Sequence, residues 1–218
     1  MPEPSLIEGA TVNPYPELFP GDIFGIKGRG ISGWACRHLI TPPTDRFHFG
    51  VVGDYLPWDN DYVILESIGK GIAVGRLSFY KPEDVEIYRV VLGQTPEQNL
   101  GKRRTEEFHD VRKRAAAELT RVGRARYDYL LVAKLGLGAL RLLLKGKLPP
   151  WGAADFKWGR NSRFLCTEAC QEAWLRVGHP IIPPGIVPLP AGFAQALQEG
   201  RIRKIFPAQG SALEGQPE

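Results

Sequence analysis

The chain has 218 residues, of which 43% are hydrophobic, and a formal net charge of +4. This length and apolar content suffice for one sizeable core, so we expect a single domain with additions. The small net charge gives no reason to expect a nucleic-acid partner. Three cysteines without paired CxxC spacings argue against a disulfide framework and against a structural zinc site. The first residues lack the basic and apolar regions of a secretory signal, so we expect a cytoplasmic protein.

Short apolar runs separated by glycine and proline fill the first 91 residues and predict strands. The expected strands are residues 22–26, 47–52, 62–68, 71–76 and 85–90. Residues 56–61 have the composition of a turn, which would make the second and third of these strands antiparallel neighbours. That arrangement places His48 and Glu66 close enough for a side-chain pair.

The second half of the chain predicts helices. Apolar residues recur at helical spacing from Thr105 to Val122, and Arg112 is among the basic residues expected on the opposite, solvent-facing side. The apolar run 130–144 is too short to span a bilayer comfortably. We favour a buried core or lid helix for it, and a face lying on a membrane surface is the alternative. A helix beginning at Cys166, an extended proline-rich connection and a short helix at 193–199 follow.

Cys166 lies where an apolar segment meets the start of an amphipathic helix. A cysteine at a helix start ionises more readily, because the first backbone N–H groups have no partner within the helix and the positive end of the dipole stabilises an anion. A thiolate nucleophile also needs a base, and His48 in its apolar strand is the candidate. Glu66 is the expected group to orient the imidazole. Asp128 and Asp54 are the rival orienting groups.

The remaining thiols and imidazoles have simpler interpretations. Cys170 lies one helical turn beyond Cys166 and is expected to pack in the core. Cys36 is expected to do the same. Structural or surface positions are expected for three histidines: His38, His109 and His179.

Six segments carry a resemblance to one known family. In chain order they are Pro20-Gly21-Asp22-Ile23-Phe24, Gly30-Ile31-Ser32-Gly33-Trp34, His48-Phe49-Gly50-Val51-Val52, Leu65-Glu66-Ser67, Ala125-Arg126-Tyr127-Asp128-Tyr129 and Phe164-Leu165-Cys166-Thr167-Glu168. Together they resemble the circularly permuted papain-like cysteine hydrolases of the NlpC superfamily, in particular the YiiX/YaeF-like group, which is distantly related to lecithin retinol acyltransferase. The resemblance covers residues 21–193. Thr167 stands where the family usually has serine.

The resemblance implies an α+β fold of the permuted papain-like type, in which an antiparallel sheet packs against the cysteine helix with additional helices. The domain would span residues 20–206, after an N-terminal extension at 1–19. It would contain an insert at 92–126 and the apolar helix at 130–145. A flexible tail would follow at 207–218.

The resemblance also implies acyl transfer through a thioester, with Cys166 as nucleophile, His48 as base and Glu66 as the third catalytic residue. Substrate-binding roles would fall to Tyr127, Asp128 and Trp34. No metal or organic cofactor is implied. The substrate would be a peptide, another amide or a lipid, and the sequence leaves open whether water or another acceptor takes the acyl group. Other interpretations are a non-catalytic papain-like binding or structural module, and a lipid-acting acyltransferase with peripheral membrane contact.

Overall fold

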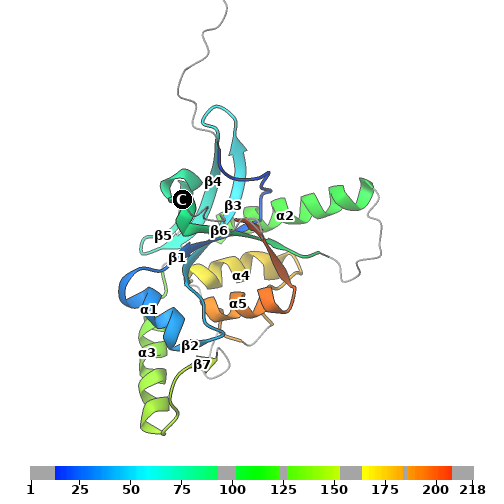
Figure 1. The fold of residues 1–218 in the computed structure, drawn as a ribbon. Coiled ribbons are helices and arrows are strands. Elements are labelled where there is room, and N and C mark those ends of the chain that lie inside the picture. The colour runs from blue at the N-terminus through cyan, green and yellow to red at the C-terminus, as the bar shows by residue number, and fades with distance from the viewer. Residues whose placement is uncertain (1–12, 93–101, 123–126, 153–163, 184–185, 208–218) are drawn as a thin grey trace, which may run out of the picture.

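The computed structural model describes residues 13–92, 102–122, 127–152, 164–183 and 186–207, and Figure 1 shows its fold. A six-stranded antiparallel sheet with the order β5-β4-β3-β1-β6-β8 forms its centre. Its strands are β1 (Ile23–Lys27), β3 (Arg46–Leu56), β4 (Asp61–Ile68), β5 (Gly71–Arg76), β6 (Val85–Val90) and β8 (Ile202–Phe206). A short parallel pair joins β2 (Ile40–Thr41) to β7 (Trp151–Gly152). With the helices described next, this confirms the expected mixed α+β class.

Helices follow or interrupt the strands. They are α1 (Gly30–His38), α2 (Lys102–Val122), α3 (Tyr129–Leu144), α4 (Cys166–Arg176) and α5 (Pro190–Gln198), with two 3-10 turns, η1 (Leu77–Phe79) and η2 (Pro82–Asp84). The expected strands and helices are confirmed in type, and β5 and β6 have the expected bounds. Strand β8 was not expected. The expected N-terminal extension, insert and tail lie partly outside the described residues, which exclude 1–12, 93–101, 123–126 and 208–218.

The larger hydrophobic core lies between the sheet and three helices. Strand residues such as Phe49 and Val51 pack there with Leu119 of α2, Trp174 of α4 and Phe193 of α5. The segment expected as an insert therefore supplies α2 to the main core. Figure 1 shows α4 and α5 on the same side of the sheet.

A second, smaller core covers the opposite sheet face. Because strand side chains alternate between faces, Phe24 and Val52 point away from their neighbours Ile23 and Val51. The second core includes Phe24, Val52, Ile64 and Leu77. His48 and Glu66 occupy strand positions of this same face, two residues from Gly50 and Ile64.

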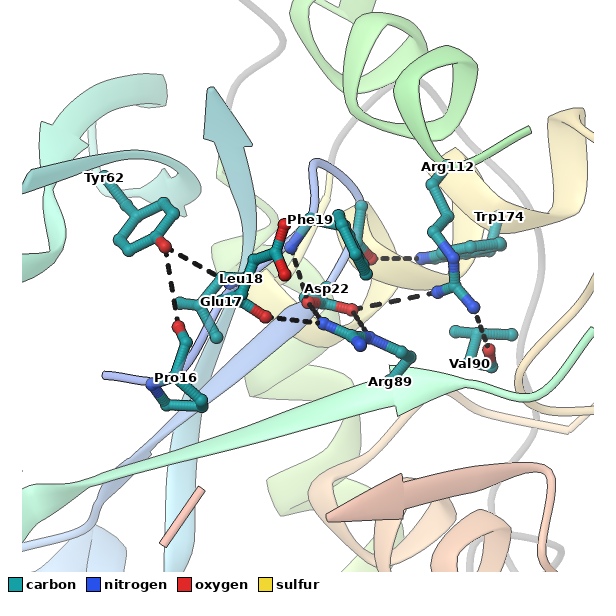
Figure 2. A network of polar contacts seen from close by, with 11 residues as sticks. Pro16, Glu17, Leu18, Phe19, Asp22, Tyr62, Arg89, Val90, Arg112 and Trp174 are labelled. Carbon is teal, nitrogen blue, oxygen red and sulfur yellow. Dashed lines mark hydrogen bonds and ion pairs between the residues drawn. The ribbon is translucent and has the colours of Figure 1, made fainter. Parts of the chain in front are cut away.

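A buried carboxylate, Asp22, links the sheet to its surroundings, as Figure 2 shows. Its oxygens accept hydrogen bonds from Arg89 Nε at 2.9 Å and Arg89 Nη2 at 2.6 Å. The backbone N–H of Phe19 also donates to Asp22 Oδ2, at 2.9 Å. The guanidinium of Arg89 in turn lies 4.3 Å above the Phe19 ring. These contacts neutralise a charge that would otherwise be costly to bury.

Arg112 belongs to this network, and its expected position on a solvent-facing basic surface is wrong. The residue is buried on α2, where its Nη2 donates to the Val90 carbonyl at 3.1 Å and its Nη1 lies 3.8 Å from Asp22 Oδ1. Burial lowers the pKa of Arg112 to about 10, although the negative charge of Asp22 opposes the shift. Trp174 Nε1 donates a hydrogen bond of 3.2 Å to the Gly21 carbonyl, which attaches α4 to the chain beside Asp22 (Figure 2).

The apolar helix α3 lies below α1 in Figure 1, away from the sheet and outside the main core. Leu137, Leu140 and Leu144 are exposed, so the favoured interpretation of a buried core helix is wrong for these leucines. The partly buried Leu135 packs against Val187 and Leu189 and attaches the helix to the segment before α5. Among the described residues, no helix is both long and apolar enough to cross a membrane.

Candidate active site

The first turn of α4 presents Cys166 at the end of the sheet. The helix starts at this residue, and Leu165 precedes it in an extended conformation. Glu168 Oε2 accepts a hydrogen bond from the Leu165 N–H at 2.8 Å, which fixes the chain entering the helix. One residue earlier, the Phe164 carbonyl accepts a hydrogen bond from Ser67 Oγ at 2.9 Å. The strand that carries Glu66 is thereby tied to the segment that carries the thiol.

The β3–β4 hairpin brings His48 and Glu66 together. Gly50 is paired with Glu66 across the two strands, and His48 lies two residues from Gly50 on the same face. Such diagonal neighbours are within reach of long side chains. The His48 Nε2 and Glu66 Oε2 atoms are 2.5 Å apart. The expected pairing of these two side chains is confirmed.

Gly50 leaves room for an aromatic side chain beside the imidazole. A Cβ atom at this position would lie 2.3 Å from the Phe24 ring and 2.7 Å from the Leu65 carbonyl oxygen. Without it, the Phe24 ring packs edge-on beside His48, with ring centroids 6.3 Å apart. Steric crowding therefore explains why residue 50, two positions after the histidine, is a glycine. The Phe24 ring in turn restricts the orientation of the imidazole.

Tyr80 is a member of the site that sequence reasoning missed. It follows η1, and its hydroxyl donates a hydrogen bond of 2.7 Å to Glu66 Oε2, the same oxygen that contacts His48. Its ring also lies near the imidazole, with a centroid separation of 6.5 Å. Nothing in the local pattern of residues 77–80 marks this tyrosine, because only the packing of the 3-10 turn beneath β4 brings it to the carboxylate.

The thiol of Cys166 meets the imidazole near the start of β3. Cys166 Sγ lies 3.9 Å from the carbonyl oxygen of Phe47, the residue before His48, and Cys166 is close enough to contribute to the raised pKa of His48. Each imidazole nitrogen offers one in-plane proton or lone pair. Because Nε2 of His48 faces Glu66, Nδ1 is the nitrogen left for the thiol.

The electrostatics of the site favour a protonated His48. Burial by itself lowers the pKa of this imidazole, but the hydrogen bonds to Cys166 and Glu66 and their negative charges outweigh burial and raise it to about 9. Burial likewise opposes the charge on Glu66, yet its hydrogen bonds to His48 and Tyr80 bring its pKa below the ordinary value. At neutral pH the pair is therefore an imidazolium and a carboxylate.

The other two cysteines have a different environment, and their expected core positions are confirmed. Burial, followed by the nearby Cys166, raises the pKa of Cys36 to about 11. Cys170 is fully buried, and burial raises its pKa well above the usual value. Both thiols therefore stay protonated near neutral pH.

Of the three residues expected to bind substrate, two lie against the segment that leads to Cys166 and one lies on helix α1. Tyr127 forms an isolated β-bridge with Phe164, and the Asp128 N–H donates to the Phe164 carbonyl at 3.4 Å, so both lie against the chain leading to Cys166. Asp128 is buried there, whereas the partner that the structure gives to His48 is Glu66. Trp34 is half exposed on α1 and packs edge-on against His38. It lies two residues before the buried Cys36, so it points to another face of the helix.

The rest of the candidates lie apart from these groups. Asp54, a rival orienting group, is exposed, and His109 packs edge-on against Phe19. Within the described parts of the chain, no group of three or more His, Cys, Asp or Glu residues is arranged to hold a metal ion. Comparisons of the chain with family models, with curated proteins and with solved structures find no match.

Proposed function

We propose that the protein is a cysteine-dependent hydrolase or acyltransferase that cleaves an amide or ester bond through a thioester on Cys166. One observation carries this proposal: the His48 imidazole contacts the Glu66 carboxylate at 2.5 Å, and the Cys166 thiol lies 3.9 Å from the carbonyl oxygen of the preceding residue, Phe47. A nucleophile, a base and a third group that orients the base are the three parts that thiol catalysis needs.

The reaction would begin from the thiolate and the imidazolium. Cys166 Sγ attacks the substrate carbonyl carbon, forming a C–S bond and a tetrahedral oxyanion. When the oxyanion collapses, the C–N or C–O bond breaks, and the Nδ1 proton of His48 passes to the leaving amine or alcohol. An acceptor then attacks the thioester and gives its proton to Nδ1, and the C–S bond breaks to regenerate the thiolate.

Glu66 and Tyr80 keep the base in its working orientation throughout this cycle. The Glu66 carboxylate accepts a hydrogen bond from the Nε2–H of His48, so Nδ1 is the nitrogen that exchanges protons with substrate. Tyr80 donates to the same carboxylate oxygen and fixes its position. Backbone N–H groups in the first turn of α4, including that of Cys166, would stabilise the oxyanion. Losing one such donor typically lowers the rate by about 100- to 1000-fold.

The same residues carry the resemblance to the circularly permuted papain-like hydrolases. We extend the proposal to that fold, because a histidine strand, a glutamate strand and a cysteine helix follow one another in the chain and meet at one site. On this basis the substrate is an amide or an ester of a peptide or a lipid. Water as acceptor gives a hydrolase, and an amine or alcohol gives an acyltransferase.

Labelling with acyl electrophiles tests the proposal directly. The folded protein is treated with a panel of amide-like and ester-like electrophiles, and mass spectrometry identifies the modified residue and any released product. We expect a single adduct on Cys166 that is absent from Cys166→Ala and strongly reduced in His48→Ala. Cys36→Ala is the matched control, because that thiol is also buried but has no imidazole partner in the site, and it should label like the unmodified protein. Equal labelling of Cys166 in the unmodified protein and in His48→Ala, or no labelling at all, would favour a non-catalytic binding module.

A further inference from the structure

One face of α3 exposes a stripe of leucines. Leu137, Leu140 and Leu144 are spaced by three and four residues, which places them on one side of a helix. Their side chains are 67%, 52% and 80% exposed. In Figure 1 the helix extends away from the sheet, below α1. Single exposed leucines are common in soluble proteins, but a continuous stripe of them marks an interaction surface.

A stripe of cations runs beside the leucines. Lys134, Arg141 and Lys145 are spaced by seven and four residues, so they share a second side of the helix, about 90° around its axis from the leucines. Lys145 continues the helical path, since its N–H bonds the Arg141 carbonyl at 3.2 Å. All three are exposed. The sequence from Tyr129 to Leu148 contains no aspartate or glutamate, so no acidic residue of this segment compensates their charge.

The orientation of this face is set by the opposite side of the helix. Leu135 packs against Val187 and Leu189, so the leucine and cation stripes are turned outward. Between these two residues, the Pro188 carbonyl accepts a hydrogen bond from Thr167 Oγ1, beside Cys166. The outward face of α3 is thereby connected through one short segment to the start of the cysteine helix.

We propose that α3 docks the protein on the surface of an anionic lipid bilayer, with the leucines in the interface and Lys134, Arg141 and Lys145 against the lipid headgroups. Leucines next to a basic stripe are the pattern of a helix that lies in the plane of a membrane interface. The charges favour this occupant over a second copy of the chain, because two such faces brought together would place cations against cations. This surface is independent of the thiol chemistry proposed above.

The expected loss of membrane binding follows from the number of charges and the apolar area that each set of substitutions removes. Each lysine or arginine near an anionic membrane surface strengthens binding by about fivefold. Replacing all three with glutamine should therefore weaken binding on the order of a hundredfold. Leu137→Gln with Leu140→Gln keeps good helix formers but removes apolar area, and it should weaken binding by at least about tenfold.

Vesicle flotation with the full chain tests the docking. The protein is mixed with phosphatidylcholine vesicles or with phosphatidylcholine vesicles containing phosphatidylserine, and the bound fraction is measured at about 0.1 M and about 1 M salt, where the Debye length falls from about 10 Å to about 3 Å. We expect binding to the anionic vesicles at low salt, little binding to the neutral ones, and a marked loss at high salt. Both sets of α3 substitutions should reduce binding and leave the melting temperature unchanged, since the replaced side chains are exposed.

Matched substitutions elsewhere separate this surface from general charge and apolarity. Lys113→Gln, Arg114→Gln and Arg203→Gln together change the net charge equally at exposed positions outside α3. Val74→Ser with Phe79→Ser removes exposed apolar groups of β5 and η1. Both controls should bind like the unmodified protein. Equal binding to neutral vesicles, equal loss in the controls, or a dimer in sedimentation that Leu137→Gln with Leu140→Gln dissociates would overturn the proposal. Because no readout depends on catalysis, the result for membrane docking does not depend on whether Cys166 is a catalytic nucleophile.

Discussion

Replacing Glu66 with glutamine tests the coupling between the base and its carboxylate. Glu66 Oε2 lies 2.5 Å from His48 Nε2, and the two side chains are only 11% and 19% exposed. A hydrogen bond with a charged partner contributes about 1.5–3 kcal/mol, and one pKa unit corresponds to about 1.4 kcal/mol. We therefore expect Glu66→Gln to lower the pKa of His48 from about 9 by roughly one to two units. The contribution of the nearby Cys166 remains, so the pKa of His48 should stay above its ordinary value.

NMR titration of the imidazole measures this change. The chain has four histidines, and the spectrum of His48→Ala assigns the signal. In parallel, alkylation of Cys166 by iodoacetamide should require a higher pH in Glu66→Gln, because less imidazolium is present to stabilise the thiolate. Asp128→Asn is the matched control and should leave the titration of His48 unchanged. An unchanged pKa in Glu66→Gln, or a larger shift in Asp128→Asn, would refute the assignment of Glu66 as the orienting group.

The same substitution has a consequence for stability. His48 has a pKa of about 9 in the folded chain against an ordinary value of 6.5, so protonation favours the folded state. This contribution is complete below pH 6.5 and is lost as the pH rises through about 9. We expect the free energy of unfolding to fall across that window. In Glu66→Gln the fall should be smaller and should end at lower pH, which urea denaturation at a series of pH values would measure.

Three further outcomes are expected. Iodoacetamide near neutral pH should modify Cys166 in preference to the two other thiols, because burial raises the pKa of both; peptide mapping that finds equal modification would contradict this. Tyr80→Phe removes one hydrogen bond to Glu66 and should lower the free energy of unfolding by about 1 kcal/mol. It should also raise the pKa of the Glu66 carboxyl. A Glu66 titration identical to that of the unmodified protein would count against this role of Tyr80. Asp22→Asn leaves the partly buried Arg89 and the buried Arg112 without their counter-charge and should cost about 3–5 kcal/mol in urea denaturation; a loss below about 1 kcal/mol would mean that these ion pairs matter little.

Local patterns were sufficient to predict the His48–Glu66 pair. Alternating strands joined by a short turn determine which residues lie side by side, and this information is contained in about twenty consecutive positions. The expected strands, the antiparallel pairing of the strands that carry His48 and Glu66, and the position of Cys166 at a helix start are all confirmed on this basis. Such features depend on backbone periodicity and on helix geometry rather than on distant contacts.

Features that depend on tertiary packing were not predictable in this way. Arg112 has the spacing of a surface residue but is buried, because Asp22 and the Val90 carbonyl provide partners from other parts of the chain. The apolar run of α3 predicted burial, and no hydrophobic partner covers its outward leucines among the described residues. Tyr80 reaches Glu66 only through the fold of η1. In each case the deciding contact comes from residues that no local window contains.

The chain positions of the three candidate site residues also determine when the site can form during folding. Only 18 residues separate His48 from Glu66, so their hairpin closes a short loop, whereas 119 residues separate Phe47 from Cys166. Closing the longer loop costs more entropy, and the cysteine helix α4 is synthesised after the hairpin. A nascent or partly unfolded chain therefore carries an ordinary cysteine, with no imidazolium beside it. Under the function proposed above, activation of Cys166 would require the finished fold, so the unfinished chain would be protected from indiscriminate acylation and the reactivity of Cys166 would report on folding.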